Sequence, residues 1–163
     1  MLLRFRLHPV AIIGDIEQAL LQLQLDEKDR DLRLFFWYRV TRDIGWDYDT
    51  TDKVIYYRFT RLPFGLPCSP FLLSALVREL AAMHKDNFPT AAMLVDSSTF
   101  MDDFVAGVED DNDVIAIYYQ LTALMRKYNF PMGKWAYNSE SLKTIRGVGG
   151  LENKSITQVL GVK

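Results

Sequence analysis

Short apolar runs separated by polar breaks mark the first part of the chain. The run PVAIIGD (9–15) is rich in β-branched residues and predicts a buried strand that ends in an acid. The run IEQALLQLQL (16–25) consists of good helix formers and predicts a turn of helix directly after that strand. The polar stretch DEKDRD (26–31) then predicts a solvated connection.

Two further runs are rich in aromatic and β-branched residues, LRLFFWYRV (32–40) and VIYYRFTRL (54–62). The polar stretch TRDIGWDYDTTDK (41–53) separates them. Such a pattern predicts a β-hairpin with a long polar loop.

Two segments carry apolar residues at helical spacing. The first has Ser69 as a candidate N-cap and Pro70 at the first helical position. Its apolar face comprises Leu72, Leu73, Leu76, Val77 and Leu80. The second helix is predicted to open at Asp111 or Asn112. Its apolar face comprises Val114, Ile117, Tyr118, Leu121, Leu124, Met125 and Tyr128.

Strands are predicted between and after these helices. The runs AAMLVD (91–96) and STFMDDFVAGV (98–108) predict strand, turn and strand, and TQVLGVK (157–163) predicts a last strand. With the hairpin at about 26–60 set aside as an insertion, the order of elements approximates the split β-α-β layout of ferredoxin-like domains. The predicted fold class is therefore α+β, an antiparallel sheet with two helices on one face and the other face open.

Composition narrows the class of protein. A chain of 163 residues predicts one domain with a real core, and its net charge of −2 gives no global electrostatic case for a nucleic-acid partner. The single cysteine, Cys68, excludes an internal disulfide and fits a reducing compartment. No apolar run approaches a membrane span, and the N-terminus does not resemble a secretory signal. We expect an intracellular protein, cytoplasmic or nuclear and not secreted, with no membrane partner.

Three acids are the strongest chemical candidates. Asp15 ends the first predicted strand, and Asp102 with Asp103 occupies a turn between apolar residues. If the central strands are neighbours, these carboxylates form an oxygen-rich site suited to two Mg²⁺ or Mn²⁺ ions. Spacing alone favours a plainer interpretation, in which Asp15 is a helix N-cap and the other two are ordinary turn residues.

Five motifs change that balance. GDIEQALLQLQL, LPFGLPCSPFLL, FMDDFVAG, NFPMGKW and VLGVK occur in the order of the palm motifs of reverse transcriptases. The sequence resembles this family over nearly its whole length. DRDLRLFFW and TRLPFGLPCSPFLL are most similar to the reverse transcriptase of Pao/BEL-type LTR retrotransposons. The resemblance implies a polymerase palm with a partial fingers hairpin. It also implies two-metal transfer of a deoxynucleoside triphosphate onto a primer 3′-hydroxyl.

The resemblance also implies roles for individual residues. Asp15, Asp102 and Asp103 match the acids that bind the two catalytic metals. The positions that match nucleotide-binding residues are Ile16, Leu20, Phe64, Gly65 and Lys134. Those that match template or primer contacts are Pro63, Phe100 and Met101. Plainer alternatives remain for three groups: a helix-entry turn for 63–65, a surface lysine for Lys134 and a core residue for Leu20.

Two positions depart from the family pattern. Leu20 stands where an aromatic ring usually presses against the sugar, and Phe100 stands where a tyrosine usually opens the hairpin motif. We expect residues 1–163 to be a single reverse transcriptase domain fragment of a polyprotein, without the N-terminal fingers strands, thumb, RNase H and integrase. Its expected partners are an RNA or DNA template-primer and a deoxynucleoside triphosphate. The alternative is a non-catalytic remnant that keeps the fold or binds nucleic acid.

Overall fold

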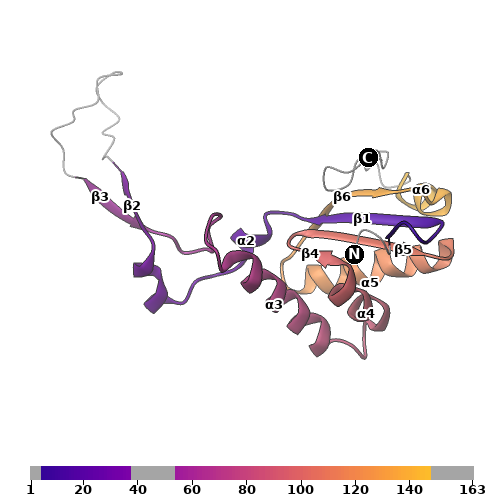
Figure 1. Ribbon diagram of the computed structural model, residues 1–163, viewed down its shortest axis with the longest axis horizontal. Coiled ribbons are helices and arrows are strands. Elements are labelled where there is room, and N and C mark those ends of the chain that lie inside the picture. Colours follow the sequence, from indigo (N-terminus) through magenta and orange to yellow (C-terminus); the bar gives the residue numbers. More distant parts are fainter. Residues whose placement is uncertain (1–4, 38–53, 148–163) are drawn as a thin grey trace, which may run out of the picture.

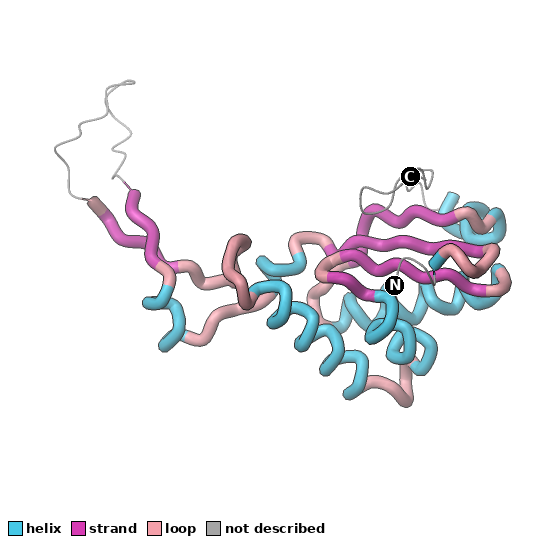
Figure 2. Tube along the Cα trace, viewed as in Figure 1, coloured by secondary structure: helices cyan, strands magenta, loops and turns pink. Residues whose placement is uncertain are grey.

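A four-stranded antiparallel sheet forms the centre of the protein. The computed structural model describes residues 5–37 and 54–147. In this part of the chain the strand order is β4-β5-β1-β6, and the four strands lie side by side in Figure 2. The strands are β1 (Val10–Ile16), β4 (Thr99–Phe100), β5 (Asp103–Val108) and β6 (Met132–Tyr137). The predicted α+β class with an antiparallel sheet is confirmed.

Helices cover one face of this sheet. In Figure 1, α3, α4 and α5 all lie below the strands. Helices α4 and α5 contact β5, while α3 packs against α4, and α6 packs against α5. No helix in the described ranges is long and apolar enough to cross a bilayer. The bounds are α2 (Ala19–Gln22), α3 (Ser69–Met83), α4 (Pro89–Ser98), α5 (Asp111–Lys127) and α6 (Glu140–Gly147).

The alternation of side chains along the strands places the core residues and the acids on opposite faces of the sheet. Ile12 and Ile16 of β1 are buried in the hydrophobic core, as are Phe104 and Ala106 of β5. Successive side chains of a strand point to opposite faces, so Asp15 is placed on the face away from the helices. The binary pattern of the strands therefore fixes the side of the sheet on which the carboxylates lie.

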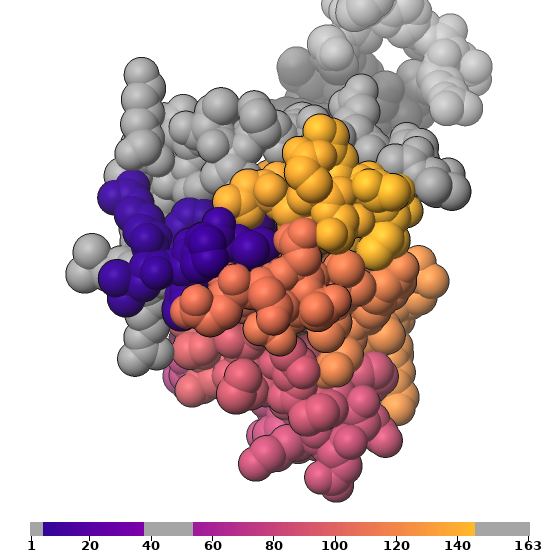
Figure 3. Space-filling model, turned by 90° about the vertical axis from the view of Figure 1, so that its right-hand side faces the viewer, coloured from indigo at the N-terminus to yellow at the C-terminus, as the bar shows by residue number. Residues whose placement is uncertain are grey.

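Part of that second face is covered by the N-terminal segment. Gly107 lies so close to it that an added Cβ would come within 2.7 Å of the Phe5 carbonyl oxygen and 3.2 Å of His8. Figure 3, which faces the right-hand side of Figure 1, shows indigo atoms of the N-terminal part next to orange atoms from later in the chain. His8 also pairs with Glu109 through Nδ1 and Oε1, 2.7 Å apart.

The two long helices were predicted with different success. Helix α5 begins at Asp111 as expected, and Asp110 caps it by accepting hydrogen bonds from the backbone N–H groups of Asn112 and Asp113. In α3 the predicted N-cap was wrong, because Ser69 is the first helical residue. Its hydroxyl instead donates to the carbonyl oxygen of Pro63 at 2.9 Å.

The predicted hairpin is present. Strands β2 (Leu34–Trp37) and β3 (Ile55–Arg58) pair antiparallel, and Figure 1 shows them projecting away from the main sheet. Before them, the expected solvated connection is a 3₁₀ helix, η1 (Glu27–Leu32), none of whose residues is buried. The connecting stretch 41–53 lies outside the described residues.

Two parts of the predicted layout need correction. Residues 91–96 form helix α4 instead of a strand, with Ala91, Val95 and Ser98 on its buried side. The fourth strand of the described sheet is β6, which was not predicted as a strand. The strand predicted at 157–163 lies outside the described residues.

Candidate metal and nucleotide site

Two of the three acids meet across the central strand pair. Asp15 and Asp103 are register partners in the antiparallel pairing of β1 with β5. Asp102 lies in the short turn between β4 and β5, where Met101 adopts a left-handed conformation with φ of 57°. The backbone N–H of Ile16 donates to the Asp102 carbonyl oxygen at 2.8 Å, and this hydrogen bond holds the turn against the end of β1.

The three carboxylates converge. Asp15, Asp102 and Asp103 each offer an oxygen, and these oxygens all lie within 4.8 Å of one another. The convergence expected from the sequence is confirmed as geometry. Asp15 is not a helix N-cap, because it lies inside β1 and Gln18 occupies the N-cap position of α2.

The surroundings of Asp103 disfavour the negative charge of its carboxylate. Partial burial raises the pKa of its carboxyl group, and the charges of Asp102 and Asp15 raise it further. The nearby ammonium group of Lys134 acts in the opposite direction. Three hard oxygen donors that repel one another in this way fit a divalent cation such as Mg²⁺ or Mn²⁺, which would relieve the repulsion.

Lys134 reaches the cluster from β6. Its Nζ atom lies 2.8 Å from Oδ2 of Asp15, and the Lys134 side chain is 71% exposed while that of Asp15 is 18% exposed. The hydrogen bond to Asp15 and its charge raise the pKa of the Lys134 ammonium group. The lysine predicted from the sequence is thus in direct contact with a predicted metal ligand.

Two residues close to Asp15 in the sequence were not predicted, Gly14 on the helix side of the sheet and Glu17 near Lys134. Gly14 lies beneath Trp135, where an added Cβ would come within 2.8 Å of the indole ring. The carboxylate of Glu17 occupies the space where a side chain on Gly133, the register partner of Asp15, would lie. Glu17 follows Asp15 by two positions, just after β1 ends, and this nearness to an acid of the first motif was the available signal.

The other predicted residues occupy two environments. Ile16 and Leu20 belong to the hydrophobic core, with Leu20 only 4% exposed. Phe64 is 68% exposed, and Gly65 follows with φ of 84° and open space where a side chain would be. The roles of these residues in nucleotide binding stay predictions.

The predicted template and primer contacts adjoin the acids or α3. Phe100 is exposed and is the register partner of Asp103, and Met101 directly precedes Asp102. Pro63 is tied to the start of α3 through Ser69. Contact of these three residues with template or primer stays a prediction.

Comparison with known proteins agrees with this geometry. Protein P of Woodchuck hepatitis B virus (isolate w64/pWS23) is 35% identical over 66 residues, which is 40% of this chain and 11% of that protein. Protein P of Arctic squirrel hepatitis virus is also 35% identical over 66 residues, covering 40% of this chain and 7% of that protein. The chain thus matches a small part of these relatives. Residues 5–135 match the family described as "Reverse transcriptase (RNA-dependent DNA polymerase)", and the chain belongs to that family.

Proposed function

We propose that this chain is the palm of an RNA-directed DNA polymerase that adds a deoxynucleotide to a primer 3′-hydroxyl. The observation that carries the proposal is the convergence of Asp15, Asp102 and Asp103 within 4.8 Å in a chain of the reverse transcriptase family. On this proposal the three acids hold two divalent metal ions, Mg²⁺ or Mn²⁺.

Bound metal ions would activate the attacking hydroxyl and stabilise the leaving phosphate oxygen. The chain itself supplies rigid placement of the ligands. Asp15 and Asp103 are fixed by the β1–β5 ladder, and Asp102 is fixed by the hydrogen bond from Ile16 to its carbonyl oxygen. Lys134, whose side chain is largely in solvent, is suited to contact the triphosphate and to give a proton to the departing pyrophosphate.

Residues beside the acids would receive the substrates. We propose Ile16, Leu20, Phe64, Gly65 and Lys134 for the incoming nucleotide. The open backbone at Gly65 permits close approach of a ligand, and the exposed ring of Phe64 offers a stacking surface. We propose Pro63, Phe100 and Met101 for the template or primer strand.

The biological setting is a finer proposal. The stretch TRLPFGLPCSPFLL supports an origin in a Pao/BEL-type LTR retrotransposon. We propose that residues 1–163 form one reverse transcriptase unit, in which the hairpin within about 26–60 is a fingers element. In such an element the fingers, thumb, RNase H and integrase regions would act with it in an intracellular compartment. A non-catalytic remnant is the competing function, and the intact acid cluster speaks against it.

Primer extension tests the proposal. The full chain is incubated with an annealed RNA template and DNA primer, deoxynucleotides and Mn²⁺ or Mg²⁺. We expect weak extension that is lost in Asp102→Asn. Asp86→Asn provides the matched control, because it removes the charge of an exposed aspartate outside the cluster. Equal extension by both variants, or none by the wild type under any metal, would contradict the proposal.

A further inference from the structure

Lys134 occupies an unusual backbone position. Between the register pairs Ile13–Ala136 and Asp15–Gly133, strand β6 contains one residue more than β1, which makes a β-bulge. Lys134 lies in this bulge with φ of 45°, a left-handed conformation that favours glycine over a lysine. Strain of this kind persists where the surrounding structure enforces it, and bulges redirect side chains.

The residue after Lys134 shows what enforces the bulge. Trp135 is buried and packs its ring edge-to-face against Tyr118, with centroids 5.0 Å apart. Its ring also fills the space above Gly14. Because Trp135 is anchored on the helix side of the sheet, the bulge directs Lys134 to the opposite face, where the acids lie.

The Lys134 side chain partly neutralises the negative charge of the three carboxylates. Its ammonium nitrogen lies 2.8 Å from Oδ2 of Asp15, one of the oxygens expected to bind metal. The same positive charge opposes the repulsion that Asp102 and Asp15 exert on Asp103. In the metal-free protein, Lys134 therefore reduces the repulsion between the carboxylates, as a bound divalent cation would do more strongly.

We propose that Lys134 is an internal counterion that holds the metal-free carboxylate cluster and is displaced from Asp15 when a divalent cation binds. The inference rests on the proposed function of the site. Most of the Lys134 side chain is in solvent, so it can leave Asp15 without disturbing the core. The lysine and the metal then compete for one carboxylate oxygen, and removal of the lysine charge should tighten metal binding.

The test measures Mn²⁺ binding to the full chain without nucleotide, by electron paramagnetic resonance of the free ion. We expect Lys134→Met and Lys134→Gly to bind Mn²⁺ about two- to fivefold more tightly than the wild type, the range for one partly exposed ion pair. Glycine suits the left-handed backbone, so this variant keeps the test valid if methionine disturbs the bulge. Lys134→Arg keeps the charge and should stay within about twofold of the wild type.

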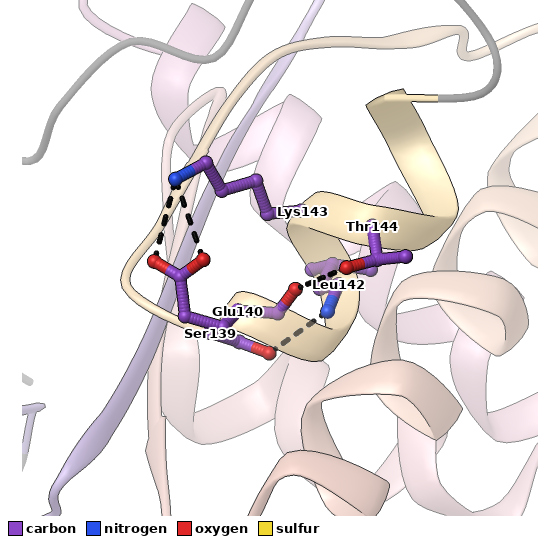
Figure 4. A network of polar contacts seen from close by, with 5 residues as sticks. All are labelled: Ser139, Glu140, Leu142, Lys143 and Thr144. Carbon is purple, nitrogen blue, oxygen red and sulfur yellow. Dashed lines mark hydrogen bonds and ion pairs between the residues drawn. The ribbon is translucent and has the colours of Figure 1, made fainter.

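Lys143→Met is the matched control. Lys143 also pairs with a carboxylate, that of Glu140 at 3.3 Å, and Figure 4 shows this pair on the first turn of α6. Helix α6 follows the end of β6 that pairs with Ile12, away from Asp15. We expect Mn²⁺ affinity to be unchanged in this variant.

Two results would overturn the inference in distinguishable ways. If Asp102→Asn weakens Mn²⁺ binding while both Lys134→Met and Lys134→Gly bind no more tightly than the wild type, the counterion role is wrong and the metal site stands. If Asp102→Asn leaves Mn²⁺ binding unchanged, both the metal site and the counterion role are wrong.

Discussion

The carboxylates of Asp15 and Asp103 belong to residues directly opposite each other in the β1–β5 ladder. Like charges at opposed positions of an antiparallel pair destabilise the sheet. Lys134 offsets this repulsion only in part, and a bound divalent cation would offset it further, so the same pair that would build the metal site weakens the metal-free fold.

Replacing Asp103 with asparagine should therefore stabilise the metal-free protein. The change removes the negative charge of the Asp103 carboxyl group, whose pKa is raised by burial and by its two acidic neighbours. We expect the free energy of unfolding to rise by about 0.5–1 kcal/mol, measured by urea denaturation in the presence of a chelator. Asp86→Asn, outside the cluster, should leave it unchanged.

In saturating Mn²⁺ the wild type should become more stable than Asp103→Asn. The wild type gains stability from ligand binding, whereas Asp103→Asn has lost a proposed ligand and gains less. A variant that is still the more stable protein in saturating Mn²⁺ would show that Asp103 does not bind the ion.

Substituting Gly14 with alanine should disturb the bulge. An added Cβ would come within 2.8 Å of the Trp135 ring and 2.9 Å of the end of the Met132 side chain. The indole ring cannot yield as a flexible chain does, so we expect a loss of about 1–3 kcal/mol in the free energy of unfolding. The smaller ring-free side chain of Trp135→Leu should reduce the penalty of Gly14→Ala in a double-mutant cycle. Additive effects of the two changes would argue against this contact.

Leu20 gives a prediction about sugar selection. As an aliphatic residue at the expected sugar-contacting position, it should reject ribonucleotides by only about 10²-fold. Leu20→Phe should improve that ratio, measured by single-nucleotide incorporation with paired ribo and deoxy substrates. Because Leu20 is only 4% exposed, the larger ring should also cost about 1–3 kcal/mol of stability.

Leu20→Met is the volume-conserving control for that experiment. It should cost less than about 1.5 kcal/mol and leave the selectivity unchanged. If Leu20→Phe lowers stability without changing the ratio of ribo to deoxy incorporation, Leu20 is a core residue and does not select the sugar.

The β2–β3 hairpin should make the chain self-associate. Phe36 and Tyr56 are opposed in its ladder, and each is 64% exposed. Exposed apolar surface of this kind promotes association. We expect concentration-dependent dimers or larger species by sedimentation velocity, and fewer of them after Phe36→Ser with Tyr56→Ser. Tyr119→Ser, an exposed tyrosine on α5, should have no such effect.

Long periodic segments were the predictable part of the fold. Helix α5 carries apolar residues at helical spacing over its whole length and a capping aspartate, so its start was found correctly. The run at 91–96 was mistaken for a strand because a short apolar run fits either a buried strand or a buried helix. Pro89 at the start of α4 was the neglected signal for a helix.

Strand β6 was missed for a different reason. Its bulge at Lys134 breaks the alternation of buried and exposed positions, and the preceding Pro131 and Gly133 suggest a loop. The candidate site likewise combines features that the sequence predicted with one that it did not. The acids were identified from motifs and their convergence was expected, but the contact of Lys134 with Asp15 depends on a bulge that no periodicity reveals.

The pairing of β1 with β5 also ties the site to the order of folding. Asp15 lies near the start of the chain and Asp103 beyond the hairpin, α3 and α4, so a long loop must close before the two carboxylates meet. A short peptide carrying either motif holds only part of the ligand set. On the proposed function, metal affinity would thus depend on the closed chain topology, and a bound ion would report that this non-local closure is complete.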